Sequence, residues 1–506
     1  MVQFHPVELT KGFKAAKALA DAYTWEEKLG ELVKGETSKA VVEVRHFDDV
    51  SFGELIHNLK SDIALEIEHQ SLPSDRTLDP KVKATWVATA RKVCGYRVLM
   101  RWIGCEEDES EHDFWVNFCS ADIHRIGWTS ENRPNGAFYI PPQFLFDRRT
   151  DWPSFFVEKL SPLRTVVRQF ETFKRQVTKC KLQVGERVEL LDNQVSTRVR
   201  PATVVKTVGR RVCLTVKSTD CDGKHDPHAE DIGEERQYES DFWCDQSSYF
   251  IFHVGWAHLN DYTLYARDAY TKHAAEVAGA LSKGVEPDWS GSDVRPETVM
   301  EWTESSDPKA VQFDVGMKLE LLDPLDTTFN QLKVATVINI LKRGYIVVGA
   351  DGDDQEREAI PFHCTSNFLF PVGYAKKYGI KLVPPSNSDA KKFDWNSYLK
   401  QTQASAAPEF LFPHVPLAAE MAEKFPIGAS LEASDLNESQ LICPAHIVAI
   451  KGRLLEIGYD GWDSTYNQLF DYRSHDIFPL GWSEAHGYKL ELPHGYQEPS
   501  KKKRKH

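Results

Sequence analysis

The sequence predicts a mainly β protein with helical arms, built from four tandem copies of one unit. Three sequence markers that recur about every hundred residues lead to this prediction. The first is a tryptophan that follows an acidic or polar residue and opens a helix-like segment, found at Trp25, Trp152, Trp289 and Trp395. The second is a glycine followed by an aromatic residue behind an apolar turn such as IFHVGW or IFPLGW, found at Gly127, Gly255, Gly373 and Gly481. Self-similarity at a fixed period is typical of repeat proteins, so four matched pairs of markers indicate four copies.

The third marker lies between the other two and has the pattern G-x-x-[LV]-E-x-x-D. The spacing from glycine to aspartate is identical in three copies, Gly185 to Asp192, Gly316 to Asp323 and Gly428 to Asp435. The first copy has the altered form Asp62-x-x-Leu65-Glu66-Ile67-x-His69. The motif therefore aligns all four copies and shows that the first has lost the final aspartate.

The stretches after this marker alternate between apolar and polar residues in short runs. Examples are residues 335–340 and 345–348, which are separated by a turn that contains glycine. Period-two runs of this length, broken by glycine, predict a small antiparallel sheet that is closed or nearly closed. Residues 11–34 and 262–283 carry apolar side chains at helical spacing. Each unit is thus expected to be a helical arm plus a small β-barrel.

The markers divide the chain into four repeats and a tail. We place repeat 1 at residues 1–140, repeat 2 at 141–260, repeat 3 at 261–385, repeat 4 at 386–498 and a basic tail at 499–506. Segments rich in proline or serine are interpreted as linkers, at 141–151, 384–392 and 404–416. The acidic, histidine-containing stretch 219–236 is expected to be an exposed loop insertion in repeat 2.

Charge limits the partners that the chain can bind. The 506 residues include 61 lysines and arginines against 75 aspartates and glutamates, which gives a net charge of −14. Little direct DNA binding is expected, because proteins gain affinity for nucleic acid by neutralising phosphates with basic residues. The exception is the basic run Lys501 to Lys505, interpreted as a nuclear import signal, with a solvated tail as the alternative. The predicted location is therefore the nucleus, and no apolar stretch is long enough to predict a membrane span.

The sequence carries no enzyme signature. It lacks H-E-x-x-H, G-x-S-x-G, a P-loop and a dinucleotide fingerprint. The nine cysteines are scattered and include no C-x-x-C pair, so neither a disulfide framework nor a cysteine zinc site is expected. His225 and His228, with Asp226 and Asp231, are a candidate metal cluster, for which a solvated acidic loop is the alternative. We expect a protein that is not an enzyme and needs no cofactor.

Several motifs together resemble the malignant brain tumour (MBT) repeat. These are the tryptophan-bearing arm, the G-x-x-L-E-x-x-D turn, the block from Tyr459 to Asp463 (YDGWD) and the terminal P-x-G-W at 479–482. Residues 113–128 are similar to the opening repeat of proteins with four such units. The resemblance covers nearly the whole chain. It implies a compact array of four repeats, each with a Tudor-like, SH3-like barrel, in a Polycomb-group-like chromatin protein that represses transcription.

The resemblance also implies a methyl-lysine pocket in repeat 4. Asp435 matches the carboxylate of such a pocket, and Tyr459, Trp462 and Tyr466 match its three aromatic walls. Aromatic faces hold an alkylated ammonium through cation–π attraction, and a carboxylate adds a charge-assisted hydrogen bond when the ammonium keeps an N–H. Such a pocket favours mono- and dimethyl lysine. The family often has asparagine three residues after the carboxylate, where this chain has Glu438, so the methylation state is left open.

The other copies lack parts of this set. Repeat 3 keeps Asp323 but has the block from Ala350 to Asp353 (ADGD) in the place of the first two walls, and repeat 2 keeps Asp192 but its aromatic block is interrupted near residues 222–224. Repeat 1 has Trp102 as one wall, with Cys105 and His69 at the positions of a second wall and of the carboxylate. We therefore expect one working pocket, in repeat 4, while the markers common to all copies serve packing.

The predicted function is that of a chromatin reader that binds methylated lysine on histone tails and contributes to transcriptional repression. Histone H3 is the first expectation for the tail and H4 the alternative, with proteins of chromatin-repressor complexes as further partners. Two other interpretations stay open. In the first, the aromatic residues of repeat 4 only fill the core of the barrel, as such residues do in most small barrels. In the second, the chain is a nuclear scaffold whose repeats bind protein partners, and its pocket is weak or vestigial.

Overall fold

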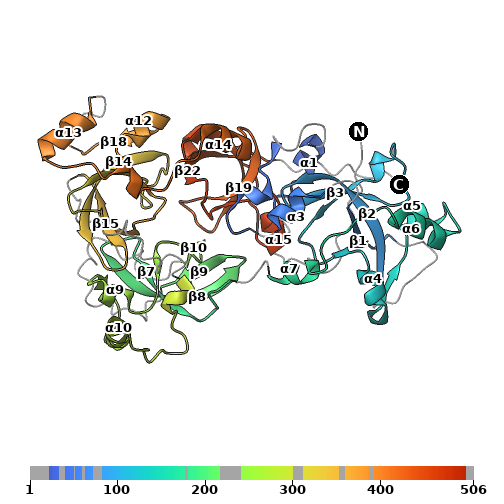
Figure 1. Cartoon of the computed structure of the whole chain (residues 1–506), viewed down its shortest axis with the longest axis horizontal. Coiled ribbons are helices and arrows are strands. Elements are labelled where there is room, and N and C mark those ends of the chain that lie inside the picture. The colour runs from blue at the N-terminus through green and yellow to red at the C-terminus, as the bar shows by residue number, and fades with distance from the viewer. Residues whose placement is uncertain are drawn as a thin grey trace.

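The computed structural model describes residues 22–32, 40–50, 52–59, 63–71, 82–176, 180–216, 241–299, 312–352, 359–386 and 392–496. Four curled β-sheets follow one another along the chain, joined by short helices, which confirms the predicted mainly β repeat fold (Figure 1). The insertion at 219–236, the basic run at 501–505 and much of the stretch 11–34 lie outside the described residues. No helix within the described ranges is long and apolar enough to cross a membrane.

The four sheets share one topology. The first four strands form an antiparallel meander, the fifth pairs with the first, and in repeats 1 to 3 a sixth pairs in parallel with the second. The strands of repeat 1 are β1 (Ala64–Glu68), β2 (Lys83–Cys94), β3 (Arg97–Trp102), β4 (Phe114–Asn117), β5 (Ile123–Arg125) and β6 (Ala137–Tyr139). Those of repeat 2 are β7 (Arg187–Leu191), β8 (Arg198–Val208), β9 (Arg211–Thr215), β10 (Asp241–Asp245), β11 (Ile251–Phe252) and β12 (Thr263–Leu264). Strand β12 pairs with β8 although it lies just beyond residue 260, where the sequence predicted the end of repeat 2.

Repeats 3 and 4 continue the pattern. Repeat 3 contains β13 (Lys318–Leu321), β14 (Gln331–Ile340), β15 (Tyr345–Ala350), β16 (Ile360–His363), β17 (Leu369–Phe370) and β18 (Lys381–Val383). Repeat 4 contains β19 (Ser430–Ser434), β20 (Ile442–Lys451), β21 (Leu454–Tyr459), β22 (Gln468–Asp471) and β23 (Ile477–Phe478). The strands predicted at 335–340 and 345–348 are confirmed as parts of β14 and β15.

One helix type follows the fifth strand in every repeat: α4 (Trp128–Glu131), α9 (Trp256–Leu259), α12 (Tyr374–Tyr378) and α15 (Trp482–His486). The arms and connections contain α1 (Glu26–Leu32), α3 (Gly53–His57), α5 (Gln143–Phe146), α6 (Trp152–Leu160), α7 (Phe170–Gln176), α10 (Asp268–Ser282), α11 (Pro296–Val299), α13 (Trp395–Thr402) and α14 (Ala418–Lys424). The helix expected at 262–283 therefore begins at Asp268.

A β-bulge at the same place in each sheet explains the curl. The pairing of the second strand with the third shifts by one residue at Ala90/Lys92, Val204/Lys206, Val337/Asn339 and Ile447/Ala449. A bulge bends its strand and increases the local twist. The same bulge also makes the ladders of the four sheets superimposable, so strand register identifies equivalent residues among the repeats.

The glutamate of the G-x-x-L-E-x-x-D motif joins two of the sequence markers. Its buried carboxylate accepts hydrogen bonds of 2.5–2.8 Å from the N–H groups of the marker glycine and of the residue two positions later. These N–H groups begin the short helix and have no partner within it. The four carboxylates belong to Glu66, Glu189, Glu320 and Glu432. Burial raises the pKa of Glu189 to about 7 and raises those of Glu320 and Glu432.

Each barrel binds the arm that follows it in the chain, except the last. Trp395, at the start of α13, donates to Glu320 of repeat 3 at 2.8 Å, and Tyr398 donates to Asp351 at 2.7 Å. Repeat 4 binds the N-terminal arm in the same manner. Trp25 donates to Glu432 at 2.9 Å, and Lys28, three residues on, pairs with Asp460 at 2.8 Å. The chain thus closes on itself through repeat 4.

The expected helix after each marker tryptophan is present in three of the four arms. Trp152 and Trp395 begin α6 and α13, and Trp25 directly precedes α1. The prediction is wrong for Trp289, which lies in a loop. The carboxylate of Asp293 accepts from the Ser290 N–H at 2.8 Å, and such side-chain bonds compete with helix formation.

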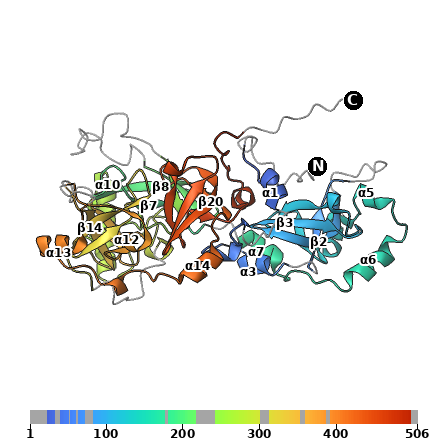
Figure 2. The same cartoon turned by 90° about the horizontal axis from the view of Figure 1, so that it is seen from above.

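Repeats 2, 3 and 4 form a closed ring, and repeat 1 lies to one side of it (Figures 1 and 2). Each ring contact places the turn between the second and third strands of one repeat against the helix after the fifth strand of another. Repeat 4 contacts repeat 3 in this way through Gly452 and Tyr374, and repeat 3 contacts repeat 2 through Tyr345 and Trp256. Repeat 2 contacts repeat 4 through Gly209.

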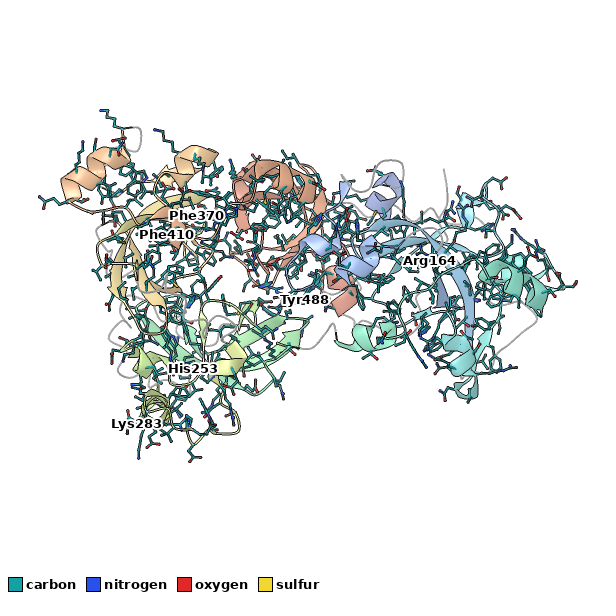
Figure 3. All side chains as sticks on the ribbon, in the orientation of Figure 1. Arg164, His253, Lys283, Phe370, Phe410 and Tyr488 are labelled. Carbon is teal, nitrogen blue, oxygen red and sulfur yellow. The ribbon has the colours of Figure 1, made fainter. Side chains whose placement is uncertain are left out.

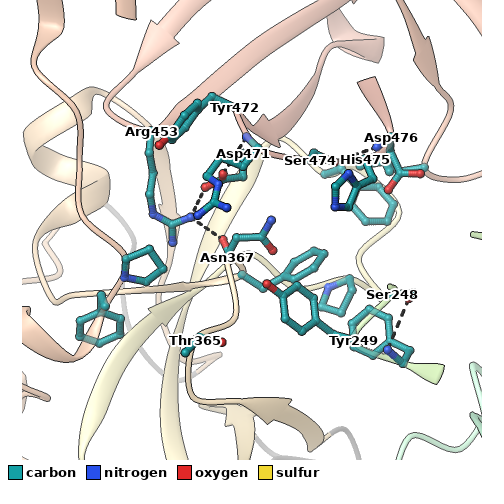
Figure 4. Close-up of a pocket in the computed structure, with 18 of the residues that line it drawn as sticks. Ser248, Tyr249, Thr365, Asn367, Arg453, Asp471, Tyr472, Ser474, His475 and Asp476 are labelled. Carbon is teal, nitrogen blue, oxygen red and sulfur yellow. Dashed lines mark hydrogen bonds and ion pairs between the residues drawn. The ribbon is translucent and has the colours of Figure 1, made fainter. Parts of the chain in front are cut away.

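Arginine side chains add to these contacts. Arg453 donates to the backbone oxygens of Asn367 and Leu369 in repeat 3, at 2.8 and 2.7 Å, and forms a buried ion pair with Asp471 (Figure 4). Arg211 donates to the Ser439 oxygen of repeat 4 and lies over the ring of Tyr488, which Figure 3 labels. Both arginine side chains are buried between repeats, so they join repeat 4 to repeats 2 and 3.

Repeat 1 binds the same part of repeat 4 that repeat 2 contacts. The Tyr96 N–H donates to the Leu480 oxygen at 2.8 Å, and Arg97 pairs with Glu484 of α15 at 2.8 Å. The ring surrounds a cavity of about 1990 Å³ that is lined by residues of repeats 2, 3 and 4 and by Asp48 and Asp49 of the N-terminal segment.

Candidate functional site

The four residues predicted for the pocket lie on three neighbouring segments of repeat 4. Asp435 directly follows β19, Tyr459 ends β21, and Trp462 lies in the turn after it. Tyr466 ends the short 3-10 helix η10 (Ser464–Tyr466), which leads into β22. Asp463 caps this helix by accepting from the Thr465 N–H at 2.9 Å, and that bond lowers the pKa of Asp463.

Gln468, which the sequence did not single out, connects the carboxylate with the first aromatic wall. Its amide N–H donates to Asp435 Oδ1 at 2.9 Å, and its amide oxygen accepts from the Tyr459 hydroxyl at 2.6 Å. The Tyr459 hydroxyl also lies 2.7 Å from the Ser434 oxygen. Gln468 is buried and occupies the first position of β22. It therefore holds Asp435 and Tyr459 in fixed relative positions.

The aromatic residues differ in exposure. Tyr459 is only 6% exposed, and burial raises the pKa of its hydroxyl. Trp462 is 45% exposed and Tyr466 56%, and their ring centroids lie 5.1 Å apart with the planes at 65°. Large aromatic residues with this much free surface are not core residues. Two of the three predicted walls are thus available to a ligand, and Tyr459 lies deeper.

His494 packs against Trp462 and is a second residue that the sequence did not reveal. The two ring centroids are 4.7 Å apart. The backbone approaches closely here, because a Cβ at Gly461 would lie 2.3 Å from the His494 oxygen, and Gly461 has φ +81°. Glycine is the residue that tolerates both conditions. The segment that contains His494 thus packs against the Trp462 ring and the turn that carries it.

The polar partners of Asp435 among the described residues are neutral. Asp435 Oδ1 accepts from Gln468 and from the Asn437 N–H at 2.9 Å. The side chain of Glu438 is exposed and accepts from Gln440 at 3.1 Å. Asp435 also lies in the lining of the central cavity, whereas the three aromatic residues do not. Asp435 therefore borders the ring interior and is joined to Tyr459 through Gln468.

The equivalent carboxylates of repeats 2 and 3 are neutralised by basic side chains of the same repeat. Asp192 forms an ion pair with Arg198 at 2.8 Å, and Asp323 forms one with Lys333 at 2.7 Å. Strand register places Ala350 opposite Ala335, as Tyr459 lies opposite Ala445, so repeat 3 lacks the first wall. Residues 222–224 of repeat 2 lie outside the described residues.

The corresponding site in repeat 1 is filled by its own side chains. His69 takes the position of the carboxylate and is buried, with Nε2 2.7 Å from the Ile140 oxygen. Burial lowers the pKa of His69 to about 4, so the imidazole is neutral at pH 7. Trp102 is stacked on Phe114 with centroids 4.3 Å apart. Among the residues that the structure describes in repeat 1, neither a carboxylate nor a free aromatic face remains at this position.

Comparison with known proteins agrees with this arrangement of repeats. The family model of the mbt repeat matches residues 77–135, 186–271, 317–389 and 429–497. The chain belongs to the MBT repeat family. Its four MBT repeats are 34% identical to the protein lin-61 of Caenorhabditis elegans, over 96% of this chain and 78% of that protein.

Other relatives carry the same repeats within longer chains. The MBT chain is 32% identical to the Polycomb protein Sfmbt of Drosophila melanogaster, over 87% of this chain and 34% of Sfmbt. It is also 32% identical to MBT domain-containing protein 1 of Mus musculus, over 85% of this chain and 62% of that protein. It thus spans less than two thirds of the length of these two relatives.

A solved structure is similar over nearly the whole MBT chain. It is the crystal structure of the four MBT repeats of Drosophila melanogaster Sfmbt in complex with the peptide RHR(me)KVLR. The TM-score is 0.75 at 30% sequence identity, and the match covers 94% of this chain and 99% of the Sfmbt chain.

Proposed function

We propose that this protein is a chromatin reader that binds methylated lysine on histone tails through repeat 4. The alkylated ammonium would lie against Trp462 and Tyr466, with Tyr459 forming the deeper wall and Asp435 accepting a hydrogen bond from an N–H of the ammonium. One observation carries the proposal. Among the described residues, repeat 4 alone combines exposed aromatic rings with an equivalent carboxylate that no internal cation neutralises.

The chemistry of the pocket favours mono- and dimethyl lysine. Both keep an N–H that can donate to Asp435, and trimethyl lysine keeps none. The Sfmbt structure supports this assignment because its peptide carries a methylated lysine. Basic residues flank that lysine, and the net charge of −14 in the present chain would attract basic histone tails. Histone H3 remains our first choice and H4 the alternative.

Titration of histone peptides tests the proposal. Unmodified, mono-, di- and trimethylated H3 and H4 tail peptides are titrated into the purified protein by calorimetry. We expect methylation-dependent binding that is lost in Asp435→Ala and in Trp462→Ala. Asp323→Ala, which removes the equivalent carboxylate of repeat 3, is the matched control and is expected to bind like the wild type. Methylation-dependent binding that survives Trp462→Ala would contradict the pocket assignment.

The wider role that we propose is non-catalytic and nuclear. The protein would contribute to transcriptional repression together with proteins of a chromatin-repressor complex, as its relation to a Polycomb protein suggests. Direct contacts with DNA would be weak, because the chain is acidic. Chromatin fractionation of wild type and Trp462→Ala would test this role, and equal retention of both on chromatin would contradict it.

A scaffold function is the second candidate, and the filled sites of repeats 1 to 3 favour it. His69 replaces the carboxylate in repeat 1, and Arg198 and Lys333 neutralise the carboxylates of repeats 2 and 3, while the barrels themselves are retained. Under this alternative, folded protein would show no methylation-dependent binding and would still capture protein partners. The peptide titration separates the two candidates.

A further inference from the structure

One strand position differs between the repeat with an available carboxylate and the repeats in which it is neutralised. It lies on the second strand, directly opposite the residue that follows the buried glutamate. In repeat 3 this position is Lys333, opposite Leu321, and in repeat 4 it is Cys443, opposite Ala433. In repeat 2 it is Arg200, opposite Leu190. The three side chains therefore occupy one place in the barrel.

The basic side chains at this position extend to the carboxylate of their own repeat. Lys333 Nζ lies 2.7 Å from Asp323 and 3.4 Å from Asp326. Burial alone would lower the pKa of Lys333, but the two carboxylates raise it above the ordinary value. In repeat 2, Arg200 lies 3.9 Å from Asp192, which Arg198 also binds. Both carboxylates thus have a cation from their own barrel.

Cys443 provides no such cation in repeat 4. The thiol is partly buried, and burial, together with the nearby charge of Asp435, raises its pKa to about 12. It is therefore neutral at pH 7. The described partners of Asp435 are the Gln468 amide and the Asn437 N–H, and neither carries a charge.

We propose that residue 443 is a specificity-determining position of the repeat 4 pocket: an uncharged side chain there leaves Asp435 for the cation of a ligand, and a basic one closes the pocket. The inference rests on the proposed function. An ammonium tethered to the same barrel has a high effective concentration at the carboxylate, so a peptide lysine would have to displace it. The repeats thus differ in whether the cation comes from the barrel or from a ligand.

Three substitutions test the proposal in the full chain, with the preferred methylated histone peptide as the probe. Cys443→Lys introduces the side chain of repeat 3, and we expect it to weaken binding about tenfold or more, because Asp435 then has a charged internal partner. Cys443→Met has nearly the length of lysine without its charge and is expected to bind within about threefold of the wild type. Lys333→Met changes the same strand position in repeat 3 and is expected to leave peptide binding unchanged.

The outcomes separate this inference from the proposed function. Loss of binding in Cys443→Lys alone supports it. Equal loss of binding in Cys443→Lys and Cys443→Met would show that the volume of the side chain, and not its charge, blocks the pocket. Wild-type binding in Cys443→Lys would show that residue 443 does not affect peptide binding. Either result overturns the proposal. If Cys443→Lys does not fold by circular dichroism, Cys443→Arg, the residue type of repeat 2, takes its place. If the wild type shows no methylation-dependent binding, the proposed function itself fails.

Discussion

The indole N–H of Trp25 donates a hydrogen bond of 2.9 Å to the carboxylate of Glu432, 407 residues further along the chain. The same carboxylate binds the N–H groups of Gly481 and Ser483 at the start of α15. Trp25 therefore completes repeat 4 from outside the sequence of that repeat. It shares the Glu432 carboxylate with the start of α15, the helix that repeats 1 and 2 both contact.

Replacement of Trp25 by alanine is expected to destabilise repeat 4. The variant loses a buried indole and leaves Glu432 with one hydrogen bond fewer, so the free energy of unfolding should fall by about 3–5 kcal/mol. Chemical denaturation monitored by circular dichroism measures the change. Val157→Ala, at an exposed side chain, is the control with an expected change close to zero. A Trp25→Ala protein as stable as this control would contradict the assigned role of the N-terminal arm.

Replacement of Gln468 by leucine is expected to weaken binding of methylated peptide about tenfold, because Asp435 and the Tyr459 hydroxyl each lose a partner. Calorimetry with the preferred peptide measures the effect. The barrel should accept an apolar side chain here, since strand register places Ile360 at this position in repeat 3. Asn467→Ala removes a neighbouring bond to Glu456 and should bind normally. Equal affinity of Gln468→Leu and the wild type would show that Gln468 does not position the pocket.

Replacement of Gly452 by alanine is expected to weaken the contact between repeats 3 and 4. The new Cβ would lie 2.4 Å from the Tyr374 hydroxyl oxygen, which is fixed by bonds to the Lys451 oxygen and the Arg453 N–H. Gly428→Ala is the matched control, because its φ of +83° imposes similar backbone strain and nothing lies within 4 Å of its Cβ. The Gly452 variant should be less stable than the control by about 2 kcal/mol, owing to overpacking. Identical unfolding curves for the two variants would exclude a tight contact at this turn.

Stability should fall in mild acid through His253. Burial lowers the pKa of this side chain to about 4 from an ordinary value of 6.5, so the folded state binds fewer protons than the unfolded state between these values. Its contribution is complete above pH 6.5 and is lost as the pH falls to 4, by about 3 kcal/mol. Glu189 has the opposite effect because its pKa is raised to about 7.

The difference between wild type and His253→Leu isolates this contribution from that of the other groups. Denaturant unfolding at several pH values between 4 and 7 should show a smaller loss of stability in the variant than in the wild type. Parallel curves for the two proteins would mean that His253 is protonated in the folded state as readily as in the unfolded state.

The elements that the sequence predicted correctly depend on local pattern. Strands β14 and β15 follow from period-two alternation, and the helices at Trp152 and Trp395 begin where an aspartate precedes the tryptophan. Tyr459, Trp462 and Tyr466 lie within eight residues of each other, so their proximity follows from one turn. Their role as a methyl-lysine site stays a prediction.

The features that the sequence did not reveal depend on contacts between distant segments. Gln468 reaches Asp435 because β22 closes the sheet near the end of β19, and His494 reaches Trp462 because the chain returns there after α15. The pairing of Lys333 with Asp323 requires the strand register. Trp25 was assigned to an arm, but the barrel it joins depends on closure of the whole array.

The ring of repeats 2, 3 and 4 has no free end on which a further repeat could stack. In a solenoid each unit contacts its neighbours in a line, and a further unit can stack on the last one. Here the turn of repeat 2 already occupies α15 of repeat 4, while the turns of repeats 3 and 4 occupy α9 and α12. A fifth repeat inserted into this gene could not extend the ring and would have to attach at its rim, as repeat 1 does. The number of repeats in the ring is therefore set by geometry, and duplication of one repeat would add an appendage without enlarging the central cavity.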